Sequence, residues 1–330
     1  MTRWTVDAPT TLEFDDVMAL HVRLIAGTVA VLASDDKRSS PGGTTASQHG
    51  GHLPPIPPGR PRPGEEASAP GRAALAVSEL SGRPLQVSIE DGVLTVSYEQ
   101  LSWDGLLQFL KPRKDSAAVT LTVPAECPIQ LGVLSASAIV SGLRSGASIK
   151  GMSGDITLDG VTGDVEAETM SGELAACDVD GAVHLKSMSG GLTLAGGVLD
   201  SLDATTMSGQ VTADVRLNTA GGIHVSTMSG DVTLRLPADS DAEVRLQSTS
   251  GPVRTEFDSL RAFKAPASHT VRGNVGAGTG HVSVTTMSGA VTLLRRAVAT
   301  RGDDPPYPPR VGPMGKQKLY RTDRHPMGTL

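Results

Sequence analysis

Aromatic residues and cysteines are scarce in this chain, and each shortage excludes a class of protein. Trp, Tyr and Phe make up 3% of the 330 residues, and none lies between Leu110 and Glu256. A carbohydrate-acting enzyme would need paired carboxylates in a groove and flat aromatic platforms for sugar rings, so this class is disfavoured. Cys127 and Cys177 are the two cysteines and lack CxxC or Cys/His spacing. Neither a disulfide framework nor a structural zinc site is therefore indicated.

Long apolar runs and excess positive charge are also missing. The longest apolar stretch, Met18 to Ala33, is interrupted by His21, Arg23 and Gly27, and it falls short of the roughly 20 residues that span a bilayer. The first thirty residues lack the three parts of a secretory signal. A cytoplasmic protein without a membrane partner is expected. The net charge of −6 and pI near 5.8 oppose binding to nucleic acid.

Sequence motifs of catalysis and nucleotide binding are absent as well. The chain has no GxSxG, Walker loop, HExxH or dinucleotide fingerprint, and its glycines recur at repeat spacing instead of forming a strand-to-helix phosphate loop. The sequence therefore predicts a protein that is not an enzyme and has no cofactor.

What the chain does contain is 38 glycines and 22 prolines, which indicate repetitive and unfolded segments. Alternating residues predict N-terminal β-strands over 1–34, and a Pro/Gly/Ser composition predicts a disordered insertion over 35–72, which includes a candidate docking peptide at 54–58. Residues 73–132 are expected to form a hairpin, turning at Asp91-Gly92, and a cap with a short helix or turn over Leu101–Leu110. Repeats follow over 133–296, and then a disordered tail over 297–330.

A Met-Ser-Gly motif that recurs through the second half is the strongest signal. It begins at Met152, Met170, Met188, Met207, Met228 and Met287, and at one further position Thr249 replaces the Met. The steps are 18, 18, 19, 21, 21 and 38 residues, and glycine turns also occur at half-steps of nine. One repeat is therefore expected to be two short strands joined by two turns.

Side chains alternate in register with the motif, as a half-buried strand requires. All fourteen residues five and three places before it are apolar: Ala147, Val165, Val183, Leu202, Ile223, Val244, Val282, and Ile149, Ala167, Leu185, Ala204, Val225, Leu246, Val284. All fourteen residues four and two places before it are polar. The period of two excludes a helix.

The pattern predicts an all-β fold, a parallel β-solenoid (β-helix) of two-strand rungs with Gly turns, capped by the N-terminal strands and hairpin. Stacked at about 4.8 Å per rung, the repeats would make a rod about 40 Å long. The expected turn glycines are Gly154, Gly172, Gly190, Gly209, Gly230, Gly251 and Gly289, and the motif Met is expected to fill irregular space at the corner. The 38-residue step predicts an irregular excursion, Phe257 to Thr270, before a last rung.

These residues resemble the bacterial putative-adhesin β-solenoid family, which is catalogued as a domain of unknown function. The resemblance rests on units such as Met152-Ser-Gly-Asp-Ile-Thr-Leu158 and Met228-Ser-Gly-Asp-Val-Thr-Leu234, on Trp4-Thr-Val6 and on the closing segment 285–296. It covers about 1–34 and 74–296. It implies a parallel β-helix without assigned catalytic residues, and an adhesin label inferred mainly from shape.

One outward column contains metal-ligand side chains: Glu166, His184, Asp203 and His224. Stacked on successive rungs, they could hold a metal, but alternating acids and bases in an exposed ladder also pair favourably without one. Unequal rung lengths leave their vertical alignment open. Calcium binding of the nonapeptide type is disfavoured because only Asp155, Asp164 and Asp231 occupy the aspartate position after the turn. No metal site is therefore predicted.

The sequence favours a non-enzymatic scaffold or adhesin-like binding protein of unknown protein partner. Two alternatives remain, a self-assembling polymer resembling the bactofilins and a carbohydrate- or metal-dependent β-helix enzyme. Polymerisation needs open rungs at the ends, whereas caps and a Pro-rich tail would block stacking. A monomer or weak homo-oligomer is expected.

Overall fold

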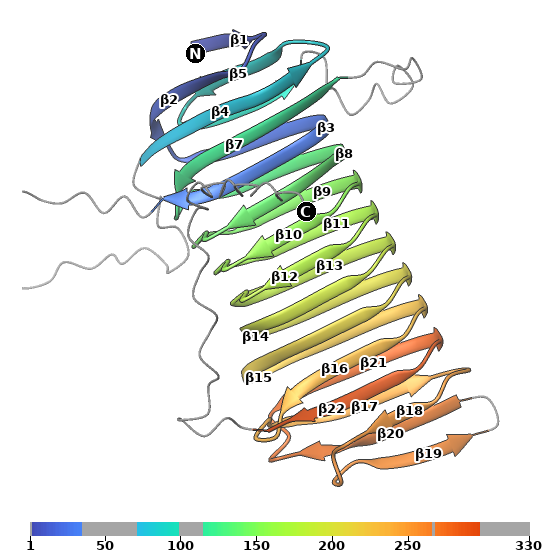
Figure 1. The fold of residues 1–330 in the computed structure, drawn as a ribbon. Helices are drawn as coiled ribbons and strands as arrows, with labels where there is room; N and C mark the ends of the chain where they lie inside the picture. The colour runs from blue at the N-terminus through green and yellow to red at the C-terminus, as the bar shows by residue number, and fades with distance from the viewer. Residues whose placement is uncertain (1, 35–70, 99–114, 266–267, 298–330) are drawn as a thin grey trace, which may run out of the picture. The chain divides into compact units, whose positions relative to one another are not determined.

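Strands form every regular element in the part of the chain that the structure describes. A computed structural model describes residues 2–34, 71–98, 115–265 and 268–297 (Figure 1), and within these ranges no helix is present that could cross a membrane. The predicted all-β class is confirmed. The expected short helix at 101–110, residues 35–70 of the expected insertion and residues 298–330 of the expected tail lie outside the described residues.

Seven N-terminal strands form two layers around one long strand. They are β1 (Thr2–Val6), β2 (Thr10–Val17), β3 (Ala19–Ser34), β4 (Gly71–Ser81), β5 (Leu85–Glu90), β6 (Val93–Tyr98) and β7 (Ser116–Pro124). β3 pairs in parallel with both β6 and β7. Antiparallel pairing then continues from β6 through β5 to β1, and from β7 through β4 to β2. The predicted hairpin is present, and it turns at Asp91 and Gly92 with positive φ.

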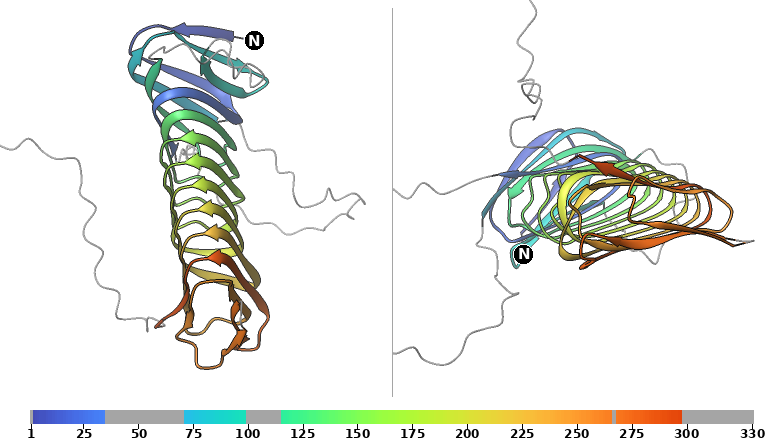
Figure 2. Two further views of the ribbon diagram at one scale, coloured as in Figure 1. Left: turned by 90° about the vertical axis from the view of Figure 1, so that its right-hand side faces the viewer. Right: turned by 90° about the horizontal axis from the view of Figure 1, so that it is seen from below.

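Eight further strands continue this body as two parallel stacks. They are β8 (Ile129–Ser141), β9 (Ala147–Ser153), β10 (Ile156–Asp159), β11 (Val165–Ser171), β12 (Leu174–Cys177), β13 (Gly181–Ser189), β14 (Leu192–Ser208) and β15 (Val211–Ser229). β8 pairs along its length with β3. One stack then runs β8, β9, β11, β13, β14, β15 and the other β8, β10, β12, β14, β15. The result is a parallel β-solenoid-like arrangement of the described repeats (Figure 2).

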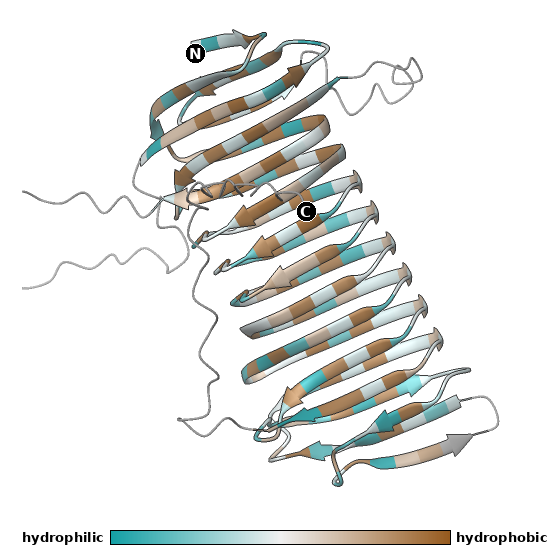
Figure 3. Ribbon diagram, in the orientation of Figure 1, coloured by the Kyte–Doolittle hydropathy of each residue, from teal (hydrophilic) through white to brown (hydrophobic). Residues whose placement is uncertain are grey.

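The core of the solenoid is the inward face predicted from the alternation. All fourteen apolar positions before the motif are at most 3% exposed, and Figure 3 shows the brown and pale bands alternating along successive strands. Burial of apolar surface, at about 25 cal/mol per Å², is the main stabilising contribution of such a core. The inward assignment is confirmed.

Extra residues in the longer rungs do not disturb the stacking at the motif. The register between β14 and β15 shifts between Ala195 and Val198 and again between Leu199 and Ser201. After these irregularities Leu202 pairs with Ile223 and Ser208 with Ser229. The far corner therefore absorbs the additional residues, and the motifs stay aligned.

The last rung in sequence is not the last rung in space. The remaining strands are β16 (Val232–Pro237), β17 (Ala242–Ser248), β18 (Val253–Thr255), β19 (Arg261–Ala265), β20 (Ser268–Val275), β21 (Gly280–Ser288) and β22 (Val291–Arg296). β21 lies between β15 and β17, and β22 lies between β16 and β18. The expectation of a terminal last rung is wrong, because every rung offers the same pairing register and the chain doubles back to insert one.

The predicted irregular excursion is also wrong in its main part. β19 and β20 form an antiparallel pair, and β20 pairs antiparallel with β17. Phe257, Leu260, Val271 and Val275 from this segment are buried. They cover apolar core at that end of the stack. Antiparallel strands thus lie at both ends of the described body.

A tightly packed turn follows each motif methionine. Gly190 has φ 146°, and a Cβ placed there would overlap the carbonyl oxygen of Gly172 on the neighbouring rung. A side chain is therefore excluded by both conformation and space. Positive φ also occurs at Gly154, Gly172, Gly209, Gly230 and Gly289, whereas Gly251 lacks it and is closed off by the Gly289 carbonyl.

Candidate functional site

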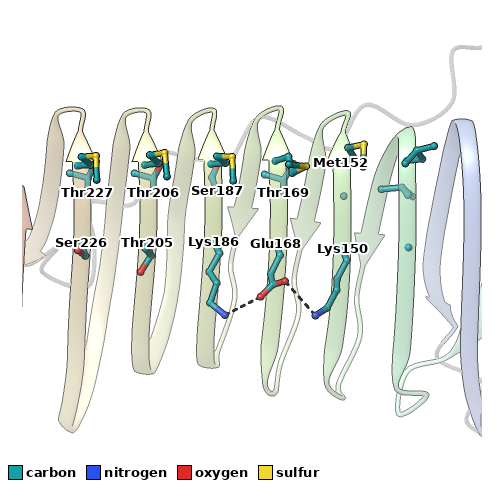
Figure 4. Close-up of a pocket in the computed structure, with 18 of the residues that line it drawn as sticks. Lys150, Met152, Glu168, Thr169, Lys186, Ser187, Thr205, Thr206, Ser226 and Thr227 are labelled. Atoms are coloured by element: carbon teal, nitrogen blue, oxygen red, sulfur yellow. Dashed lines mark hydrogen bonds and ion pairs between the residues drawn. The ribbon is translucent and has the colours of Figure 1, made fainter. Parts of the chain in front are cut away.

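A long groove runs across the solenoid beside the motif corners. It encloses about 740 Å³ and extends from Arg23 and Leu24 on β3 to Met287 on β21. One wall is the column of motif methionines, and the other is the outward column two residues before them (Figure 4). The groove therefore crosses successive rungs, so an extended occupant would contact the same position of each repeat.

The methionines do not fill space at the corner, contrary to the prediction. Met170, Met188, Met207, Met228 and Met287 are exposed at 46%, 47%, 50%, 53% and 56%. Each Met lies on the same face of its strand as the polar residues two and four positions earlier, because alternate residues of a strand face the same side. That face is exposed to solvent. The strands continue through the Ser that follows each Met, so the alternation that was predicted up to the motif also governs the Met itself.

The opposite wall changes character along its length. Its outward residues are Lys150, Glu168, Lys186, Thr205, Ser226 and Thr285. Glu168 accepts a hydrogen bond from Lys186 Nζ at 2.9 Å and lies 3.4 Å from Lys150 Nζ. These contacts hold the pKa of Glu168 below its usual range, with the Lys186 hydrogen bond as the largest cause, and they raise the pKa of Lys186.

Charge is concentrated at the N-terminal end of the groove. Arg23, Lys150 and Lys186 supply three positive charges there against the single carboxylate of Glu168. Beyond Lys186 the same wall carries only hydroxyl side chains. The two ends of the groove therefore differ in charge, with a cationic end at β3, β9 and β13 and an uncharged end at β14, β15 and β21, in a chain of net charge −6.

Small residues with buried side chains lie between the two walls of the groove. Thr169, Ser187, Thr206 and Thr227 line it and are at most 6% exposed. The hydroxyl oxygens of Ser187, Thr206 and Thr227 are buried and have no hydrogen-bond partner within the described residues. A ligand in the groove would therefore meet mainly the thioethers and the outward polar column.

The predicted ladder of Glu166, His184, Asp203 and His224 lies on the same stack, four residues before the motif. Successive members are direct partners in the strand pairing, so the structure aligns them despite the unequal rung lengths. Glu166 and His184 border a separate hollow of about 350 Å³ together with His21, whose pKa is lowered by burial and then by Arg23. No group of three His, Cys, Asp or Glu is placed to hold a metal among residues 2–34, 71–98, 115–265 and 268–297.

The fold and the groove together define a repeat protein with a lateral surface that crosses its rungs. The chain belongs to the Toastrack DUF4097 family, whose model matches residues 76–294. The resemblance stated from the sequence is thereby confirmed. The family is a domain of unknown function and brings no catalytic assignment to this chain.

Three solved structures are similar to this chain at low sequence identity. One is a putative adhesin from Bacteroides fragilis, 12% identical, with a TM-score of 0.38, covering 88% of this chain and 98% of its own. A putative adhesin from Parabacteroides distasonis is 12% identical with a TM-score of 0.35, over 88% and 97%. A putative cell adhesion protein from Clostridium sporogenes is 10% identical with a TM-score of 0.25, over 88% and 100%. Comparison with curated proteins gives no match.

Proposed function

We propose that this protein is a non-enzymatic scaffold whose methionine-lined groove binds an extended segment of a partner protein. The observation that carries the proposal is the row of exposed methionines along one wall of the groove. Methionine is unbranched and polarisable, and it recurs on surfaces that adapt to several partners. The proposal takes each rung as two strands joined by glycine turns, with the N-terminal strands and hairpin as one cap.

The side chains in the groove favour binding over chemistry. Its lining contains no histidine or cysteine, and its one carboxylate, Glu168, is paired with two lysines. Covalent catalysis needs a nucleophile beside a general base. The described lining offers no such pair.

The partner segment that fits best is apolar along its length and acidic at one end. Met170 to Met287 would contact its apolar side chains, while Arg23, Lys150 and Lys186 would face its carboxylates. Complementary charge fixes the direction in which such a segment lies and speeds its association. Binding should weaken as salt rises, because the cations are exposed to solvent.

Polymerisation of the bactofilin kind is less well supported. It requires a parallel strand edge at each end of the solenoid to accept the next copy. Here β1 and β2 at one end, and β19 at the other, pair antiparallel with their neighbours. We therefore favour a monomer or weak oligomer, which light scattering over a concentration series would test.

A labelled peptide of about ten residues with alternating Leu and Thr tests the groove directly, because alternate side chains of an extended strand face one way. A version ending in two Asp should bind at least about fivefold more tightly than one ending in two Lys, equivalent to about 1 kcal/mol. The double variant Met188→Asp/Met207→Asp should lose this binding.

The matched control is Met18→Asp, since Met18 is 40% exposed but lies outside the groove. Fluorescence anisotropy would measure the wild type, the double variant and the control with each of the two peptides. Equal binding by the double variant and the control would refute the groove as the site. Equal affinity for the two peptides would refute the proposed polarity.

A further inference from the structure

The motif methionine is kept in six rungs while its outward neighbours vary. Two residues earlier the chain places Lys, Glu, Lys, Thr, Ser and Thr in the same six rungs. Inward positions exchange Val, Leu, Ile and Ala freely. Leu or Val could also form an exposed apolar ridge, but neither carries a ligand atom, whereas the repeated Met places one thioether sulfur on each of these rungs.

The inserted last rung makes the methionine ladder continuous. In chain order Thr249 would separate Met228 from Met287. In the structure Thr227 pairs with Thr286 and Ser229 with Ser288, which places Met287 directly beside Met228. The pairs of Ser187 with Thr206 and of Thr206 with Thr227 order Met188, Met207 and Met228 in the same way. Six methionines thus occupy six adjacent rungs.

Adjacent parallel strands lie about 4.8 Å apart, so neighbouring thioethers can converge on one ion by rotating the three side-chain torsions of each Met. Thioether sulfur is a soft, neutral ligand that selects Cu(I) over hard cations. It carries no proton to be displaced, so binding would not depend on titration of the ligands.

Charge decides where along the ladder a cation would bind. Met152 and Met188 have Lys150 and Lys186 beside them on the opposite wall, which would repel it. Met207, Met228 and Met287 instead face Thr205, Ser226 and Thr285. The neutral end of the groove is therefore the favourable one.

We propose that Met207, Met228 and Met287 bind a soft monovalent metal cation, Cu(I), through their three thioether sulfurs. The site goes beyond the proposed partner binding and does not require it. Figure 4 shows sulfur-bearing side chains in one row across neighbouring rungs, and the pairing of β21 with β15 adds Met287 at the end of that row. One equivalent of metal per chain is expected at this end of the groove.

Ag(I) is the practical probe, since it has the same soft character and does not oxidise in air. Cys177 is exposed and would compete as a thiolate ligand, so the experiment uses the Cys177→Ser variant of the full chain. Cys127 stays in place because it is 1% exposed and burial raises its pKa to about 12. Calorimetry gives affinity and stoichiometry, and ¹³C-methyl methionine spectra show which side chains respond.

Saturable binding of one Ag(I), with shifts at the methyls of Met207, Met228 and Met287, is the expected result. Met228→Leu should weaken binding at least tenfold, and Met207→Leu should do the same, while Met18→Leu should leave it unchanged. Both ladder positions are half exposed, so these variants are expected to fold, and circular dichroism checks this. Unchanged affinity in both ladder variants, or no saturable binding, would overturn the proposal.

The same variants separate this site from the partner groove. Leu keeps the apolar contact but removes the sulfur, so the Leu/Thr peptide should still bind Met228→Leu after Ag(I) binding is lost. Peptide binding that fails while Ag(I) still binds at the ladder would count against the partner groove alone.

Discussion

Replacing Gly190 with Ala tests the packing of the glycine turns. The new Cβ would overlap the Gly172 carbonyl oxygen, and the residue would have to keep φ near 146°. The clash is with backbone on the adjacent rung, which no rotamer change can relieve. Any backbone shift at Gly190 would also reach Gly209, whose own Cβ position is closed by the Gly190 carbonyl.

Two costs add in this variant. A non-glycine residue held in a sparsely populated backbone region costs about 1–3 kcal/mol, and overpacking against fixed neighbours costs about another 1–3 kcal/mol. Their sum is about 2–6 kcal/mol of unfolding free energy. At about 2–4 °C per kcal/mol for a body of this size, the melting temperature should fall by at least about 4 °C.

The matched control is the next residue. A Cβ at Gly191 would lie 4.0 Å from both Gln210 O and Glu173 Cγ, which is ordinary contact, and its φ is not positive. Gly191→Ala should therefore change stability by no more than about 0.5 kcal/mol. Melting followed by far-ultraviolet circular dichroism, with hydrogen exchange to localise the loss to adjacent rungs, gives the comparison. Equal stability of the two variants would refute the turn packing described above.

Three further predictions concern side chains away from that turn. Asp115 is 4% exposed and ion-paired with Arg83 at 2.9 Å, so Asp115→Ala should cost about 1–3 kcal/mol in urea unfolding, discounted for partial exposure. The pKa of Glu168 is lowered in the folded protein, so its contacts with the lysines stabilise the fold at pH values above the usual carboxyl pKa. This stabilisation is lost as pH falls through the folded pKa. Glu168→Gln should therefore lower the melting temperature at pH 7 but not in acid. A thiol reagent at pH 8 should modify Cys177 at once and Cys127 only after denaturation, because burial raises the pKa of Cys127 to about 12.

Much of the fold could be predicted because each rung repeats one physical requirement. An apolar residue at every second position buries one face of a strand, and all fourteen predicted inward residues are buried. The hairpin at Asp91-Gly92 was equally accessible, since that dipeptide adopts the positive φ that the turn needs. Both signals are local, and local signals determine these elements.

The orientation of the methionines was misjudged, although the signal was present in the sequence. The alternation that places Leu185 inside and Lys186 outside also places Ser187 inside and Met188 outside. Hydrophobic character suggested burial, but the period of two decides the side of the sheet. Extending the pattern by two residues would have identified one wall of the groove.

The position of β21 could not be derived from local pattern. The alternation of its side chains matches that of every rung, so the pattern alone does not select a neighbour. In the structure Val282 pairs with Ile223 of β15 on one side and with Val244 of β17 on the other. The choice depends on the antiparallel pairing of β20 with β17, which covers the other edge of β17. Which strand edge β21 pairs with therefore depends on segments that are distant in sequence, and it cannot be predicted from the residues of β21 alone.

The inserted rung also separates the order of synthesis from the order of assembly. β17 is made before β21, yet its native parallel partner is β21. Domains emerge from the ribosome N-terminal end first, so any early docking of β17 on β15 must be undone when residues 280–296 appear. The native strand order β15, β21, β17 can form only after residues 280–296 have been synthesised. The solenoid can therefore be completed only once synthesis has passed residue 296.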